Sequence, residues 1–161
     1  MFVYRVVLFA VLIVILAIAS IYDFRERIIP NKLVAIGAVL GVGISLVAGY
    51  LLESLSIMGE LQNMLLGALV GGLPLLCIEV YLRLVCKKQG IGGGDIKLYA
   101  MCGLFLGLEL TISSYLALSV ISLLTVGGLL LSRKLKRKDS IPFGPLISIA
   151  VVITFFTAMW V

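Results

Sequence analysis

Apolar residues dominate this chain in long runs that short polar segments separate. Six runs stand out, at residues 1–21, 33–52, 61–82, 95–108, 111–131 and 141–161, and Glu109 marks the predicted turn between the fourth and the fifth. A helix needs roughly 20 mostly apolar residues to cross the hydrocarbon core of a bilayer. Because lipid offers backbone N–H and C=O groups no partner, spanning segments form helices. The pattern therefore predicts an all-α, polytopic membrane protein with about six transmembrane helices.

The composition supports a membrane location. Of the 161 residues, 62% are hydrophobic and 13% are charged, and the mean hydropathy is +1.25. Soluble domains contain only about 45–50% apolar residues. We therefore expect residues 1–161 to form a single integral-membrane domain in contact with the lipid bilayer. We expect the first run to be a retained helix, because its apolar core reaches beyond the roughly 7–15 residues of a cleaved signal peptide.

Positive charges gather on one side of the predicted topology. Twelve of the 13 Lys and Arg residues lie in or beside the connections after the first, third and fifth runs, and only Arg5 lies on the opposite side. Because cytoplasmic loops carry an excess of Lys and Arg, we expect these connections in the cytoplasm and both chain ends outside. The net charge of +5 is then a feature of membrane topology, and no nucleic-acid partner is expected.

The residue types that are missing limit the chemistry. The chain has no histidine, and Cys77, Cys86 and Cys102 form no C-x-x-C pair. A zinc site or a disulfide framework is therefore not expected. We predict no metal and no cofactor, so any catalysis would use carboxylates, hydroxyls, thiols or amines.

Two aspartates lie at the predicted cytoplasmic boundary. Asp23 follows the first run inside the charged segment 22–32, predicted to be a turn, and Asp95 opens the fourth run after Gly92-Gly93-Gly94. An ionisable group at this depth is a functional candidate, although Asp95 alone would also suit a helix N-cap. If the two helices pack together, the carboxylates share one proton. One group can then accept a proton from water while the other donates one.

The helix ends suggest a division of labour and further contacts. The helix dipole favours the ionised form of Asp95 and disfavours that of Asp23, so we predict Asp95 as the resting base and Asp23 as the resting acid. Glu79 and Arg83 have the spacing of an ion pair on a helix. Lys97 either extends to the lipid headgroups or adjusts the electrostatics of the site. The G-x-x-x-G spacing found in residues 37–41 permits close helix packing.

Three separated motifs give the chain a resemblance to a known family. It resembles the type IV prepilin peptidases, which are GxGD-type membrane aspartic proteases. The matching segments are Gly92-Gly93-Gly94-Asp95-Ile96-Lys97-Leu98 for the G-x-G-D motif, Asp23 with Arg27 and Ile29-Pro30-Asn31 for the first catalytic segment, and Pro142-Phe143-Gly144-Pro145 for the P-F-G-P entry into the last helix. The motifs occur in the expected order, and the match covers essentially the whole chain.

The resemblance implies an endopeptidase that cleaves the short basic leader of pilin-like precursors at the cytoplasmic membrane face, commonly after a glycine. Asp23 and Asp95 would be catalytic. The residues that would shape the site are Gly92, Gly93, Gly94, Lys97, Pro142, Gly144 and Pro145. Many members also carry an N-terminal cytoplasmic region with paired cysteines and methylate the new N-terminus. This chain resembles the short, peptidase-only form, so neither methyl transfer nor an S-adenosylmethionine site is expected.

Two other functions stay open at this point. The chain could be another GxGD protease, of the preflagellin or signal-peptide type. It could also be a small, non-enzymatic transporter in which the aspartates relay protons or cations. Peptide cleavage that depends on Asp23 and Asp95 separates the proteases from the transporter.

Overall fold

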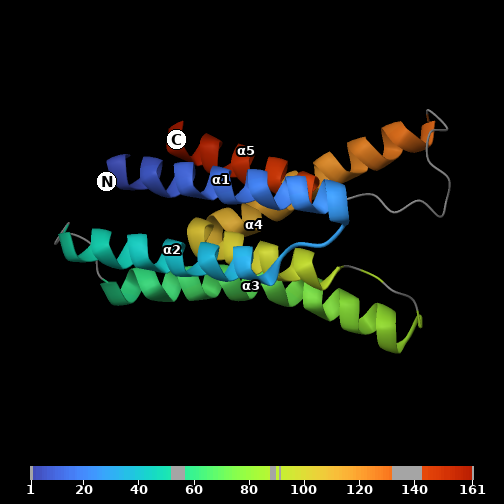
Figure 1. Ribbon diagram of the computed structural model, residues 1–161, viewed down its shortest axis with the longest axis horizontal. Helices are drawn as coiled ribbons and strands as arrows, with labels where there is room; N and C mark the ends of the chain where they lie inside the picture. Colours follow the sequence, from blue (N-terminus) through green and yellow to red (C-terminus); the bar gives the residue numbers. More distant parts are fainter. Residues whose placement is uncertain (1, 52–56, 88–89, 91, 132–142, 161) are drawn as a thin grey trace.

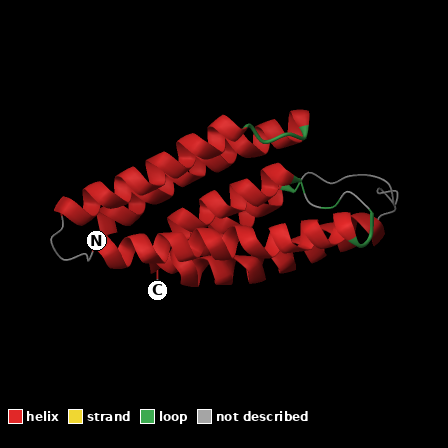
Figure 2. Cartoon of the chain, turned by 90° about the horizontal axis from the view of Figure 1, so that it is seen from below, coloured by secondary structure: helices red, strands yellow, loops and turns green. Residues whose placement is uncertain are grey.

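The computed structural model describes residues 2–51, 57–87, 90, 92–131 and 143–160. Its helices are α1 (Phe2–Glu26), α2 (Asn31–Leu51), α3 (Ile57–Leu84), α4 (Gly93–Leu131) and α5 (Gly144–Trp160), with no strand in these ranges. The helices run along one long axis (Figures 1 and 2). Four of them are long and apolar enough to cross a membrane, and α5 is a shorter apolar helix. The predicted all-α, polytopic membrane architecture is confirmed.

The chain reverses direction inside α4, at Gly107. This residue has φ 71° and ψ −178°, a backbone conformation that glycine adopts without steric cost. The hydroxyls of Tyr99 and Ser114 lie 2.7 Å apart, whereas a straight helix would separate residues with this spacing by roughly 22 Å. Figure 1 shows the second part of α4 returning toward the end from which the first part came. α4 thus supplies the fourth and fifth predicted segments.

The predicted position of this turn, at Glu109, is wrong. Glu109 already lies in the helix after the break, where its carbonyl accepts the Ser113 hydroxyl at 3.1 Å. The reversal needs a positive φ, which glycine tolerates far better than glutamate. Asn63 of α3 completes the turn, because its Oδ1 accepts the N–H of Leu108 at 2.9 Å. That bond satisfies one of the free N–H groups at the start of the new helix.

α1 extends beyond its apolar run, so the prediction of a turn over segment 22–32 is only partly correct. The helix continues through Glu26, and the carbonyl of Asp23 accepts the N–H of Arg27 at 3.0 Å. Charged side chains at a membrane edge can reach water while their backbone stays helical. The helical conformation ends at Arg27, which has φ 53°. Asp23 is therefore positioned by a helix rather than by a loop.

Glycines let α3 and α4 pack backbone against backbone. A Cβ atom on Gly67 would lie 2.2 Å from the carbonyl oxygen of Gly103, and one on Gly71 would lie 2.7 Å from that of Tyr99. Only residues without a side chain fit at such a contact. This packing fixes the first part of α4, which begins at the candidate site, against α3.

The predicted G-x-x-x-G pair on α2 packs in a different way. A Cβ atom on Gly37 would lie 2.3 Å from the sulfur of Met101, and one on Gly41 would lie 2.9 Å from the ring of Phe105. The two glycines therefore make room for large side chains of α4 and do not bring the backbones together. α2 is held against the first part of α4 by this apolar contact.

Candidate functional site

Asp23 links the end of α1 to the start of α5. Its side chain is buried, with 6% of its surface exposed, and its Oδ2 accepts the backbone N–H of Gly144 at 2.8 Å. A Cβ atom on Gly144 would lie 2.8 Å from Oδ2 and 3.0 Å from the Cβ of Asp23. The absence of a side chain at position 144 is what lets the first turn of α5 approach the carboxylate.

Asp95 lies in the first turn of α4, after the three glycines. The carbonyl of Gly92 accepts the N–H of Asp95 at 3.0 Å, and a Cβ atom on Gly92 would lie 3.2 Å from Asp95 Oδ2. A Cβ atom on Gly94 would lie 3.1 Å from the Cβ of Ile29, in the connection between α1 and α2, whereas Gly93 has open space around it. Gly94 therefore brings the start of α4 close to the end of α1.

The two aspartates come together at one end of the bundle. Figure 1 shows the end of α1, the start of α4 and the start of α5 at this end, and both chain termini at the other. Asp23 lies near enough to Asp95 for the charge of one carboxylate to act on the other, although they belong to helices far apart in the sequence. Two carboxylates at a partly buried site are not both ionised cheaply, so the pair favours a shared proton.

Lys97 and Glu79 make contacts near this end. Lys97 Nζ donates to Oδ1 of Asn31, the first residue of α2, at 3.0 Å. This bond joins two of the three sequence motifs, and sequence analysis did not anticipate it. The predicted ion pair between Glu79 and Arg83 is confirmed. Glu79 is buried, and Gly90 lies against its second carboxylate oxygen, which has no hydrogen-bond partner among the described residues.

The start of α5 also borders a hollow. A space of about 310 Å³ lies between α1 and α5, lined by Ser20, Ile21, Phe24, Arg25 and Pro145. Its surface is largely apolar, and Phe24 is 74% exposed. Pro142, predicted to shape the site, lies outside the described residues.

The described residues contain no group of three or more His, Cys, Asp or Glu side chains that could hold a metal ion. Cys77 and Cys86 are exposed and Cys102 is buried, and all three are free thiols. The polar group that the structure places against Asp23 is the backbone N–H of Gly144.

Together, fold and site define a polytopic helical membrane protein with two interacting carboxylates at one end of its bundle. Residues 10–131 match the type IV leader peptidase family, and the chain belongs to this family.

Two relatives show the extent of the similarity. The chain is 31% identical over 144 residues to a prepilin leader peptidase/N-methyltransferase of Escherichia coli (strain K12), covering 88% of this chain and 59% of that protein. It is 31% identical over 131 residues to a protein of the same description from Stutzerimonas stutzeri, covering 81% and 43%. The chain thus spans about half the length of the curated relatives it matches. No solved structure matches it.

Proposed function

We propose that this chain is an aspartic-type membrane endopeptidase that removes the short basic leader of pilin-like precursors at the cytoplasmic face of the cell membrane. The observation that carries the proposal is the placement of Asp23 and Asp95, from two helices far apart in the sequence, at one end of the bundle and near enough for their charges to interact. Family membership supports the substrate class, because the relatives are named prepilin leader peptidases.

A pair of aspartates that shares one proton has what amide hydrolysis requires. The ionised carboxylate removes a proton from a water molecule, and the water oxygen bonds to the scissile carbonyl carbon. The protonated carboxyl donates its proton to the carbonyl oxygen as negative charge develops there. When the C–N bond breaks, the leaving nitrogen takes up a proton from the pair, and one hydroxyl of the tetrahedral intermediate returns a proton to the pair. The products are a new carboxyl end and a new amine, and the pair again holds one proton.

The contact with Gly144 bears on which aspartate starts as the base. An N–H donor stabilises the carboxylate form of the group that it contacts, and the Gly144 N–H donates to Asp23. We therefore assign Asp23 as the resting base and Asp95 as the proton carrier. This proposal is the reverse of the assignment from helix dipoles.

The hollow beside Asp23 suits the apolar part of the substrate. It is bordered by Phe24 and Pro145 and lies between α1 and α5. The residues that follow Asp23 and Gly144 thus line it, next to the hydrogen bond that the Gly144 N–H donates to Asp23. A precursor whose apolar helix begins just after the cut site would place that beginning against these side chains. The extended backbone before the cut would then lie near Gly93, where none of the described residues lies within 4 Å of the Cβ position.

The test is cleavage by the purified chain in liposomes. A pilin-like precursor with a glycine before its apolar segment is added, and the products are identified by mass spectrometry. We expect a single cut after the glycine. A matched precursor with a bulky residue in place of that glycine should be cut poorly. Both precursors staying intact in the presence of folded chain would refute the proposal.

Methyl transfer needs a separate assay, because the relatives carry both activities in their names. We propose that this chain cleaves without methylating. With S-adenosylmethionine present, the mature product should keep the mass of an unmodified N-terminus. A product heavier by one methyl group would show that the second activity is present.

A further inference from the structure

The end of the bundle opposite the aspartates contains a hollow that follows from the reversal at Gly107. From Gly93 to Gly107 the first part of α4 is only about 22 Å long, whereas α1 has 25 residues and extends about 37 Å. The first part of α4 thus turns back before it reaches the opposite end. α1, α3 and α5 continue beyond the turn, and space is left between them.

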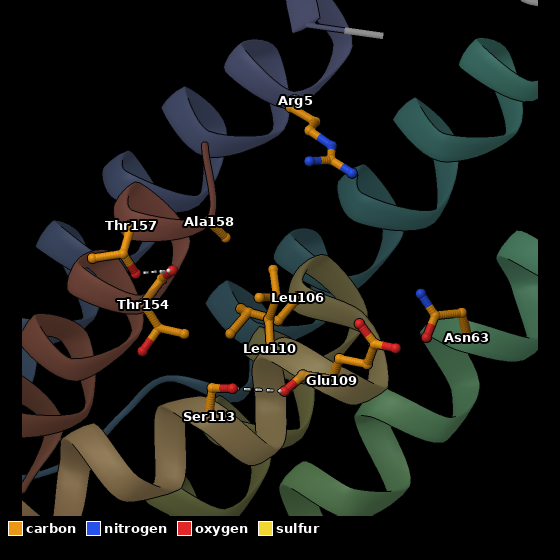
Figure 3. A pocket seen from close by; sticks show the side chains of 9 residues that line it. All are labelled: Arg5, Asn63, Leu106, Glu109, Leu110, Ser113, Thr154, Thr157 and Ala158. Carbon is orange, nitrogen blue, oxygen red and sulfur yellow. Dashed lines mark hydrogen bonds between the residues drawn. The ribbon is translucent and has the colours of Figure 1, made fainter. Parts of the chain in front are cut away.

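This space has a volume of about 610 Å³, and polar side chains from four helices surround it. Arg5 enters from α1, Asn63 from α3, Glu109 from α4 and Thr157 from α5 (Figure 3). Leu106 of α4 supplies part of an apolar wall. Convergent polar groups beside an apolar wall are typical of a binding site for a small amphiphilic molecule.

The two charged residues of this hollow are not paired. Within the described residues, neither Arg5 nor Glu109 forms an ion pair, whereas Glu79 and Arg83 do so at the other end. A second cavity of about 140 Å³ shares Arg5 and Asn63 and adds another acid, Glu60. Arg5 and Glu109 are both exposed, so a polar guest that enters the hollow can contact both charges. Their separation leaves room for a guest that carries both charges.

We propose that this hollow binds the headgroup of a phosphatidylethanolamine lipid. The phosphate would pair with the Arg5 guanidinium, whose planar fork of N–H donors matches phosphate oxygens. The ammonium would donate hydrogen bonds to the Glu109 carboxylate, and the glycerol and first acyl carbons would lie against Leu106 and Leu110. This site is distinct from the aspartate pair and does not depend on the proposed peptidase activity.

Other headgroups fit the charges less well. An anionic phosphatidylglycerol would pair with Arg5 but leave Glu109 without a cation. Phosphatidylcholine carries both charges, but its quaternary ammonium has no N–H to donate to Glu109 or Glu60. The site therefore predicts a preference for a primary ammonium together with a phosphate.

The first test uses the unmodified chain. The chain is reconstituted with equal amounts of phosphatidylethanolamine, phosphatidylcholine and phosphatidylglycerol, and native mass spectrometry records the lipids that it retains. We expect one phosphatidylethanolamine to be retained at least about tenfold more than the others, because a hydrogen bond to a charged group contributes roughly that factor. Equal retention, or a preference for phosphatidylglycerol, would overturn the proposal.

Substitutions then locate the site. Arg5→Gln and Glu109→Gln should each lower retention of phosphatidylethanolamine about tenfold. The matched control is Lys32→Gln, which removes a cation on α2 outside both cavities and should retain the lipid as the original chain does. Retention by both site variants at the control level would also overturn the proposal. If either variant fails to fold, the lipid competition with the unmodified chain decides alone.

Discussion

The two ends of the bundle use charge in opposite ways. At one end, Asp23 and Asp95 carry charges of the same sign and are brought close enough to interact. At the other end, Arg5 and Glu109 carry opposite charges and face one hollow without pairing. The first arrangement favours a shared proton and hydrolysis. The second favours binding of a zwitterionic ligand.

The difference follows from where glycine allows close approach. Gly144 and Gly94 let the starts of α5 and α4 press against the end of α1 and its connection, which gathers the acids. Gly107 turns α4 back before it reaches the far end, which keeps the side chains there apart. Glycines at different positions therefore gather the acids at one end and leave the opposite charges apart at the other.

The largest effect is expected from neutralising either aspartate. Asp23→Asn and Asp95→Asn should each lower the cleavage rate on the order of 10³-fold, because each removes one partner of general acid–base catalysis. The rate is measured on a pilin-like precursor in liposomes. Asp139→Asn, at the only other aspartate of the chain, is the matched control. Near-normal cleavage by either site variant would contradict the two-aspartate mechanism.

A methyl group at Gly144 should be the next most damaging change. The Cβ atom of Gly144→Ala would lie 2.8 Å from Asp23 Oδ2, so the carboxylate or the start of α5 must shift. A displacement of this size can lower kcat by roughly 10²-fold. Gly127→Ala is the control, because nothing lies within 4 Å of its Cβ position. Equal rates for the two variants would show that this contact does not position Asp23.

Substitution of Gly67 should lower the stability of the folded protein rather than its catalytic rate. A Cβ atom there would lie 2.2 Å from the carbonyl oxygen of Gly103, and overpacking of this kind typically costs about 1–3 kcal/mol. Thermal unfolding in detergent should show a lower Tm for Gly67→Ala than for Gly43→Ala, whose Cβ position is open. Matching Tm values would argue against the close contact of α3 and α4.

The smallest effect is expected from the bond between Lys97 and Asn31. This bond is exposed, so Lys97→Met should lower kcat/KM only a few-fold, in line with about 0.5–1.5 kcal/mol for a hydrogen bond. Asn31→Ala should behave alike, and the double variant should be little worse than either single one. Fully additive losses would mean that the two side chains act separately.

The apolar runs were sufficient to predict the helical membrane fold, because lipid requires each spanning segment to satisfy its own backbone. The apolar runs could not locate the reversal of α4. Glu109 interrupts the apolar pattern, but the helix breaks at Gly107 because that residue adopts a positive φ. The sequence does not reveal the hydrogen bond that the Leu108 N–H donates to the Asn63 side chain. Membrane helices are apolar on most faces, so periodicity does not show which face packs inward.

The candidate site was partly predictable. Residue type and motif order singled out Asp23, Asp95 and Gly144, and the structure places Asp23 against the Gly144 N–H. The Gly144 N–H can donate to Asp23 only because the main chain at the start of α5 points it there. Residue type does not reveal this orientation, so the acid–base assignment could not be made from the sequence. The hollow at Arg5 depends on where α4 turns, and from the sequence alone Arg5 bears only on the membrane topology.

The most direct test of the shared proton is infrared spectroscopy of the chain labelled with ¹³C at its aspartate carboxyls. The isotope shifts the carboxyl bands of the three aspartates away from those of the five glutamates. At about pH 5, where an ordinary aspartate is still ionised, we predict the C=O band of one protonated aspartate, which disappears in Asp95→Asn and persists in Asp139→Asn. A spectrum in which every aspartate is ionised, or a band that Asp95→Asn leaves unchanged, would contradict the account.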